Sequence, residues 1–364
     1  MSYIVFASVL IPLWVLRRHG LEKAFLWAWI PVFLCMPTMF TAKIPMVPLR
    51  TFMQAWLVPL LFVLLCDKRS EMTFGRMEML LLAYVLVRVF CDFLGRGYSD
   101  AQNYAAYMLV SLIGPYLIGR YVINRREMDV ATARMFVLMF VLFFPLFLYE
   151  LKFWVSPIYQ IFSPMFPEAF SGLSVRWGLA RTAGTFEHPI LAAIMIIAVY
   201  RLHRWLCWIG AWDAPQTGWL GRIEALMRRF PFSFKTQISI ALILMILLTL
   251  SRGPWIGALA GAALVAVGNT KNRKKWLIIL GMLFVLGGLG GKMALDAYMT
   301  PQLGEVLSDE AQTMLYRSVM IDQYKAFLMD KMWTGWGLTT VPKIPGMESV
   351  DNAFFLMALQ HGLI

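Results

Sequence analysis

The sequence contains few charged residues for its length. Only 15% of its 364 residues are Asp, Glu, Lys or Arg, whereas 60% are hydrophobic. Roughly a quarter of the residues of a typical soluble domain are charged. This shortage excludes a soluble globular enzyme and is typical of a chain whose surroundings are lipid.

Cysteine is also scarce. The four cysteines (Cys35, Cys66, Cys91 and Cys207) all lie in apolar runs or at their ends, with no CxxC pair and no histidine beside them. Zinc sites and dithiol redox sites need such clusters. We therefore predict that the cysteines are buried packing residues.

Apolar segments fill most of the chain instead. A helix needs about 20 apolar residues to cross a bilayer, because every backbone amide there must be satisfied within its own segment. Apolar runs fall at residues 3–16, 24–41, 54–66, 77–94, 105–122, 135–151, 189–209, 232–250, 254–270, 276–291 and from 353 onward. This pattern predicts an all-α, polytopic transmembrane helix bundle of about 11 spans.

The two terminal runs are short. The first has the length of a signal peptide, but Arg17, Arg18 and His19 follow it and no small-residue cleavage site is present. We interpret it as a span or a partly embedded anchor. The last run stops at Ile364 after about a dozen residues, too few to cross a bilayer, so we expect the protein to continue.

The basic residues predict the orientation of the chain. Twenty of the 33 Lys and Arg residues, with eight acidic residues, lie in the segments 17–23, 67–78, 120–134, 201–235 and 271–275. This face carries the whole net charge of +12 and is therefore predicted to be cytoplasmic. Orientation accounts for the basic excess, so no nucleic-acid partner is expected.

Three segments, 152–188, 251–254 and 292–352, have polar groups beside Gly and Pro outside plainly solvated runs, and all three fall on the opposite, outer face. We divide the chain into amino-terminal transmembrane helices at 1–152 and a core at 153–364, with a long outer loop at 292–352. Within that loop, Leu315, Val319, Gln323 and Phe327 share one helical stripe. This pattern favours an amphipathic helix that lies on the membrane surface.

The first chemically suggestive motif is RTAGTFEHPILAAIM. Arg181 and the pair Glu187-His188 stand just before a span that Pro189 opens, and Arg176 lies in the same loop. Proline suits the first helical position, and the N-terminus of a helix binds phosphate or carboxylate through its free amides. The alternative is that these residues are interfacial anchors.

The second motif is LTLSRGPWIGALAGA, in which two apolar runs meet at a tight Ser251-Arg252-Gly253-Pro254 turn. The turn needs Gly and Pro but does not need an arginine. A guanidinium at the bilayer edge is unfavourable unless an anion pairs with it. Arg252 is thus a candidate anion ligand; the alternative is that it reaches to lipid headgroups.

The third motif extends from residue 314 to residue 363. It contains Arg317, a Gly335-Trp336-Gly337 turn, and Asp351-Asn352 before the last apolar run. The three motifs in this order, from Arg176 to Ile364, resemble the O-antigen ligase and O-antigen polymerase superfamily. The amino-terminal half is similar to it only in hydropathy.

The resemblance implies a glycosyltransferase of the bacterial inner membrane. Such proteins transfer an undecaprenyl-diphosphate-linked glycan to an acceptor glycan on the periplasmic face, without a metal ion or cofactor. Arg181, Arg252 and Arg317 match arginines that bind the lipid diphosphate, and Arg176 lies near Arg181 in sequence. Asp351 stands where many ligases have histidine, which favours a polymerase of exopolysaccharide or O-antigen repeats over a ligase.

The acceptor hydroxyl needs a general base, and three residues near helix starts are candidates: Asp351 first, then Glu187 and His188. The alternative function is a flippase or transporter of lipid-linked oligosaccharide. That class is expected to show internal repeats and a charged path across the bilayer. Apart from Arg88 and Asp92, which are spaced to pair on one helix face, the sequence shows neither feature, so we favour the transferase.

Overall fold

The computed structural model is mostly helical, which confirms the all-α class. It describes residues 3–42, 51–67, 73, 75–125, 127–166, 172–213, 221–222, 225–226, 229, 231–299, 309–338, 340–347, 350 and 352–363. Within these ranges the only paired strands are β1 (Val175–Arg176) and β2 (Leu179–Ala180), which form a small antiparallel hairpin.

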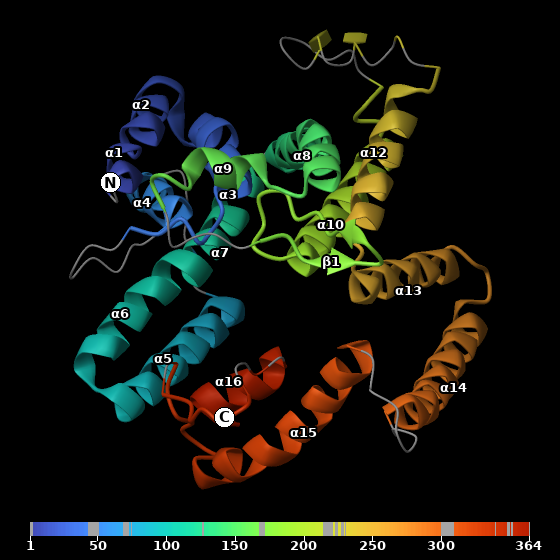
Figure 1. Cartoon of the computed structure of the whole chain (residues 1–364). Helices are drawn as coiled ribbons and strands as arrows, with labels where there is room; N and C mark the ends of the chain where they lie inside the picture. Colours follow the sequence, from blue (N-terminus) through green and yellow to red (C-terminus); the bar gives the residue numbers. More distant parts are fainter. Residues whose placement is uncertain are drawn as a thin grey trace. The chain divides into compact units, whose positions relative to one another are not determined.

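Helices make up most of the described chain (Figure 1). In chain order they are α1 (Ile4–Ala7), α2 (Leu10–Ala24), η1 (Phe25–Trp29), α3 (Ile30–Cys35), α4 (Phe52–Cys66), α5 (Arg76–Arg96), α6 (Tyr98–Met108), η2 (Leu109–Ile113), α7 (Gly114–Ile118), η3 (Gly119–Ile123), α8 (Met128–Phe153), α9 (Pro157–Phe162), α10 (Pro189–Trp208), α12 (Phe234–Leu248), α13 (Arg252–Gly268), α14 (Arg273–Met299), α15 (Asp309–Asp330) and α16 (Ala353–His361), where η marks a π-helical turn.

Five helical stretches of the described residues are long and apolar enough to cross a membrane, so the prediction of about 11 spans is not confirmed. They are Ile4–Cys35, Tyr98–Ile123, Met128–Phe153, Pro189–Trp208 and Arg273–Gly291, and the shorter apolar helices are Phe52–Cys66, Phe234–Leu248 and Arg252–Gly268. The first stretch joins two predicted runs, although Gly20 interrupts the helix with φ 79° and ψ 179°.

Two further predicted spans are absent from these five for different reasons. The helix α5 has 21 residues, but Glu78, Arg88 and Asp92 lower its apolar character. The helix α16 has nine residues, too few to cross a bilayer.

The chain divides into two compact units. Unit 1 comprises Met1–Thr73 and Leu109–Gly261, and unit 2 comprises Phe74–Met108 and Ala262–Ile364. Both units are discontinuous in sequence. The predicted division between residues 152 and 153 rests on the family resemblance and stays a prediction.

The core of unit 1 is built around α8, which packs against α10 and α12. Phe140 and Phe147 of α8, Ile196 of α10 and Leu242 of α12 are all fully buried. His203 of α10 is also buried, and its Nε2 contacts the Lys235 carbonyl and the Ser239 hydroxyl at 3.1 and 3.0 Å. These polar contacts fix the register of α10 against α12.

The cysteine prediction is only partly right. Cys91 is buried, Cys35 and Cys207 are half-buried and Cys66 is exposed. The Cys207 sulfur also lies 3.7 Å from His203 Nε2. His203 is one helical turn away, so the two residues are not adjacent in the sequence. Among the described residues no group of three or more His, Cys, Asp or Glu is placed to hold a metal ion.

The helix predicted within the long outer loop is present as α15, but its packed face differs from the predicted stripe. Met320 and Tyr324 are buried, while Leu315 and Val319 are exposed. The packed face is thus rotated by one residue from the predicted stripe. A tyrosine ring contributes as much apolar contact as a leucine side chain, so Tyr324 can take part in the packed face. The prediction that α15 lies on a membrane surface is untested.

The Gly335-Trp336-Gly337 turn is a packing element of unit 2. The N–H groups of Trp336 and Gly337 donate to the carbonyls of Leu359 and Gln360 at the end of α16, both at 2.8 Å. Gly335 has φ 67°, and a Cβ atom there would collide with the backbone of Gln360. Glycine is therefore required both for the turn conformation and for the close approach.

We expect Gly335→Ala to destabilise the protein severely. The left-handed conformation alone costs an L-residue about 1–2 kcal/mol, and the collision with Gln360 adds to it. Gly346→Ala is the matched control, since Gly346 has φ 81° but open space around it. Thermal unfolding in detergent should show the larger loss for Gly335→Ala; equal losses would refute the packing role.

Candidate functional site

The candidate site in unit 1 is built on the loop between α8 and α10. The β1–β2 hairpin lies in the part of this connection that follows α9, and its two turn residues, Trp177 and Gly178, both have positive φ, 54° and 73°. A two-residue hairpin turn of this kind matches the natural twist of the strands. The hairpin brings Arg176 and Arg181 to the same edge of unit 1.

Both arginines bind the connection between α12 and α13. Arg176 Nη1 donates to the Leu250 carbonyl at 2.7 Å. Arg181 donates from Nε to the Thr249 carbonyl at 3.3 Å and from Nη2 to the Ser251 hydroxyl at 3.0 Å. The sequence motifs around Arg181 and Arg252, 70 residues apart, are thus joined directly.

Arg252 is the first residue of α13, so the predicted turn is shifted. The chain reverses at residues 249–251, where Leu250 has φ 48°, and Gly253 and Pro254 belong to the first helical turn. Proline is tolerated there because the first amides of a helix have no intrahelical partner. The Arg252 guanidinium carbon lies 4.8 Å from the centre of the Trp177 ring, a cation–π contact with the hairpin.

The arginine cluster (Arg176, Arg181 and Arg252) is electrostatically unusual. The Arg181 side chain is buried, with 7% of its surface exposed, and it has no carboxylate partner within the described residues. Burial, and then the positive charge of Arg176, lower the pKa of Arg181 from its ordinary value. Both effects disfavour the cation and would be relieved by an anion.

A buried glutamate holds the next part of the loop. Glu150 of α8 is fully buried, and its Oε2 accepts hydrogen bonds from the N–H groups of Ala183 and Gly184, both at 2.9 Å. The two amides follow Arg181 closely, so the carboxylate fixes the backbone that carries the arginine. The sequence analysis did not single out Glu150, an isolated acid inside an apolar run.

We expect Glu150→Ala to loosen this loop. It leaves two buried N–H groups without an acceptor, at about 1–3 kcal/mol each. Glu150→Gln is the matched control, because the amide oxygen can still accept. Thermal unfolding in detergent should place Glu150→Gln between the wild type and Glu150→Ala, whereas an unchanged Glu150→Ala would exclude the anchoring role.

His188 and Glu187 stand at the start of α10, and Pro189 is its first residue as predicted. His188 is the N-cap: its Nδ1 accepts the Ile190 N–H at 3.1 Å. Partial burial, and then the charges of Arg181 and Arg176, lower the pKa of His188, so the ring is neutral near pH 7. Since Nδ1 provides the lone pair, Nε2 carries the hydrogen and can donate to an anion.

The other two candidate bases are Glu187 and Asp351. The Glu187 side chain is exposed and accepts a hydrogen bond from the Thr38 hydroxyl. Asp351 lies outside the described residues. The N-cap of α16 is its neighbour Asn352, whose Oδ1 accepts the N–H groups of Phe354 and Phe355, each at 3.1 Å.

Arg317 belongs to unit 2, on α15, where its side chain is exposed. The structure therefore gathers Arg176, Arg181, Arg252 and His188 within unit 1 and assigns Arg317 to the other unit.

The intramembrane pair predicted from spacing does not form. Asp92 Oδ1 accepts the Leu338 N–H at 2.9 Å, while Arg88 contacts Tyr84 and His361, and no ion pair joins Arg88 to Asp92. Spacing of four residues permits a pair, but each side chain finds a partner outside α5. His361, which the sequence did not single out, becomes part of this cluster.

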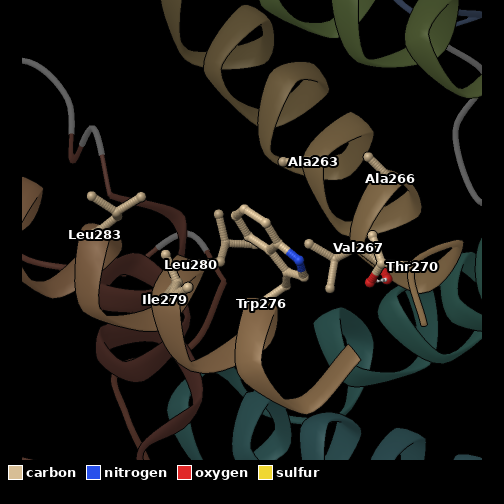
Figure 2. Close-up of a pocket in the computed structure, with 8 residues that line it drawn as sticks. All are labelled: Ala263, Ala266, Val267, Thr270, Trp276, Ile279, Leu280 and Leu283. Atoms are coloured by element: carbon tan, nitrogen blue, oxygen red, sulfur yellow. Dashed lines mark hydrogen bonds between the residues drawn. The ribbon is translucent and has the colours of Figure 1, made fainter. Parts of the chain in front are cut away.

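An apolar pocket of about 350 Å³ lies between α13 and α14 (Figure 2). Ala263, Ala266 and Val267 form one wall, and Trp276, Ile279, Leu280 and Leu283 form the other. The only polar side chain, Thr270, donates its hydroxyl to the Val267 carbonyl at 2.8 Å. A pocket of this chemistry suits hydrocarbon and offers nothing to a phosphate.

Comparison with known proteins identifies one relationship. Residues 237–364 match the O-antigen ligase family. The match confirms the resemblance to the O-antigen ligase and polymerase superfamily for the part of the chain that contains Arg252, Arg317 and Asp351. No curated protein and no solved structure matches the chain.

Members of the O-antigen ligase family are integral membrane enzymes that act on lipid-linked glycans. Arg176, Arg181, Glu187 and His188 precede the matched residues. Their connection to the family domain is the direct bonding of Arg176 and Arg181 to the α12–α13 connection, which lies inside it.

Proposed function

We propose that this protein is a polysaccharide polymerase of the bacterial inner membrane. It joins undecaprenyl-diphosphate-linked glycan repeats on the periplasmic face, and we favour this activity over ligation to lipopolysaccharide because Asp351 replaces the histidine of many ligases. The observation that carries the proposal is the arginine cluster, in which the buried Arg181 guanidinium lies near the cation of Arg176 and forms no ion pair with a carboxylate among the described residues.

The arginine cluster suits a diphosphate. A guanidinium presents paired donors that match phosphate oxygens, and partial desolvation strengthens each bond. Arg181 already uses Nε and one Nη2 hydrogen on Thr249 and Ser251, which leaves Nη1 for a ligand. His188, which lies close to Arg181 in the sequence, adds a neutral donor, its Nε2–H. We assign Arg317 to the same role by resemblance alone.

The reaction is a displacement at the anomeric carbon of the donor glycan. The acceptor hydroxyl oxygen forms the new glycosidic bond, and the bond to the diphosphate oxygen breaks with its electron pair. The acceptor proton passes to Asp351, which we propose as the general base, with Glu187 as the next candidate. The arginines neutralise the charge that develops on the leaving diphosphate, so no metal ion is required.

The function is tested by reconstitution. Purified protein is mixed with an undecaprenyl-diphosphate-linked repeat unit in chelator-containing buffer, and products are separated by gel electrophoresis and mass spectrometry. Polymerase activity gives a ladder of longer glycans on undecaprenyl diphosphate. Transfer only to an added lipid A acceptor would make the protein a ligase, and movement of intact substrate across vesicles without a new bond would make it a flippase.

The proposed sidedness has its own test. In a variant without the four native cysteines, a cysteine at Ser308 should react with an impermeant thiol reagent in intact spheroplasts, and one at Lys274 should react only after lysis. This follows from the concentration of basic residues at 271–275 on the predicted cytoplasmic face. Reversed labelling would contradict a periplasmic site.

A further inference from the structure

A second cationic cluster lies within unit 2, where α5 and α16 contact each other (Figure 1). Arg88 of α5 donates from Nη1 to the Tyr84 hydroxyl at 2.6 Å, and its Nη2 lies 2.5 Å from His361 Nε2. The rings of Tyr84 and Tyr104 lie 5.3 and 5.5 Å from the guanidinium carbon. This cluster shares no residue with the arginine cluster of unit 1.

The partners of Arg88 in this cluster are neutral. A guanidinium can only donate hydrogen bonds, so His361 Nε2 must accept and its proton must sit on Nδ1. The neighbouring acid, Asp92, is bound to the Leu338 N–H instead. Arg88 therefore forms no ion pair with a carboxylate among the described residues, although the charge of Asp92 lies one helical turn away.

The cluster also contains donors without acceptors. Arg88 Nε and His361 Nδ1 are buried and find no hydrogen-bond partner in the described part of the chain, and only 6% of the His361 surface is exposed. Buried donors and a charge without an ion-pair partner are both unfavourable. An anion with oxygen acceptors would satisfy the charge and could draw these donors into its hydrogen bonding.

A cavity of about 440 Å³ opens beside these groups. Arg88, His361 and Tyr84 form its polar end, and Leu80, Val87 and Phe354 are among the apolar residues along the rest. On α5, Leu82, Leu86 and Phe90 are exposed, as expected for a helix in contact with hydrocarbon. The site thus combines one cationic end with an apolar body.

We propose that this cavity binds an acidic phospholipid of the phosphatidylglycerol type. The phosphate lies against Arg88, and the acyl chains pack on Leu80, Val87 and Phe354. A free phosphate has the same charge, but the apolar lining gives it nothing to contact. The proposal does not depend on the proposed function, because it concerns different residues and a lipid that is not a glycan donor.

The test uses purified full-length chain in detergent, with lipid bound per protein counted by native mass spectrometry and thermal unfolding measured in parallel. The added probes are phosphatidylglycerol, phosphatidylcholine with the same acyl chains, and inorganic phosphate. Arg88→Met removes the charge at similar volume, and Arg76→Met is the control, since Arg76 is an exposed arginine on the same helix that does not line the cavity.

We expect phosphatidylglycerol to bind and stabilise the wild type and Arg76→Met equally, and to bind Arg88→Met about tenfold to a hundredfold more weakly. Phosphatidylcholine and inorganic phosphate should have little effect. Equal lipid binding by Arg88→Met would overturn the proposal, and so would full stabilisation by inorganic phosphate or by phosphatidylcholine.

A second measurement needs no variant, in case Arg88→Met does not fold. A photoactivatable phosphatidylglycerol, with its reactive group high on an acyl chain, should label wild-type peptides from residues 80–88 and 354–363. Excess unlabelled phosphatidylglycerol should remove this labelling, and excess phosphatidylcholine should not. If excess phosphatidylglycerol and excess phosphatidylcholine affect the labelling equally, the proposed site is overturned.

Discussion

Replacing Arg181 by lysine is expected to lower glycan transfer by about tenfold to a hundredfold. Lysine keeps the positive charge but loses the planar fork, and a hydrogen bond to a charged group contributes about 1.5–3 kcal/mol. Arg181 uses this fork twice, once on Thr249 and Ser251 and once, as we propose, on the lipid diphosphate. The measurement is the initial rate of glycan elongation by reconstituted protein.

The control is Arg125→Lys, in the same unit. Arg125 forms ion pairs with Glu22 and Asp67 at 3.2 and 2.8 Å, so it already has acidic partners and no expected role in anion binding. Its transfer rate should stay near that of the wild type. If Arg181→Lys loses activity only in proportion to lost folded protein, then Arg181 merely holds the α12–α13 connection.

A double variant separates shared from independent roles. Arg252→Lys alone should also impair transfer, and the combination with Arg181→Lys should be clearly less than additive if both residues hold one diphosphate. Arg181 bonds to Thr249 and Ser251, which immediately precede Arg252 in the chain, so the two arginines are close enough for such coupling. Strict additivity would indicate that Arg252 acts elsewhere, for example on lipid headgroups.

The sequence predicted the components of this site better than their arrangement. Pro189 as the first residue of α10, the break before α13 and the helix at α15 all follow from local rules for proline, turns and apolar runs. Arg176 and Arg181 were identified as candidate anion-binding residues from the loop in which they lie. Their bonds to Leu250, Thr249 and Ser251 join segments about 70 residues apart, and no local pattern specifies such a pairing.

The errors also have physical causes. The prediction of about 11 spans is not confirmed: five helical stretches of the described residues have the length and composition of a span, and the charges of α5 depart from that composition. The spacing of Arg88 and Asp92 suggested an ion pair, but the backbone N–H of Leu338 and the His361 ring are better placed partners. Glu150 was missed because a buried acid is recognisable only when its two amide donors are known.

Asp351→Asn is expected to abolish most transfer, by about a hundredfold to ten-thousandfold, because removal of a general base typically has that effect. Asparagine is nearly the same size as aspartate and cannot accept a proton at neutral pH. Protein yield and thermal unfolding should remain normal. The measurement is again elongation of undecaprenyl-diphosphate-linked glycan by purified protein.

The alternative role for Asp351 is that of a helix cap, and the structure supplies a control for it. The cap of α16 is Asn352, which accepts from Phe354 and Phe355. Asn352→Ala should therefore lower stability by about 1 kcal/mol, while Asn352→Asp, which can still cap, should not. Asp351→Asn should show the opposite profile, with stability kept and transfer lost.

These variants together distinguish a loss of catalysis from a loss of folded protein. If Asp351→Asn elongates glycan at nearly the wild-type rate, the base lies elsewhere, and Glu187→Gln becomes the informative variant. His188 is a weaker replacement, because its lone pair at Nδ1 is already engaged by the Ile190 N–H. A base there would first have to release the cap of α10, which would move the backbone that carries the arginine cluster.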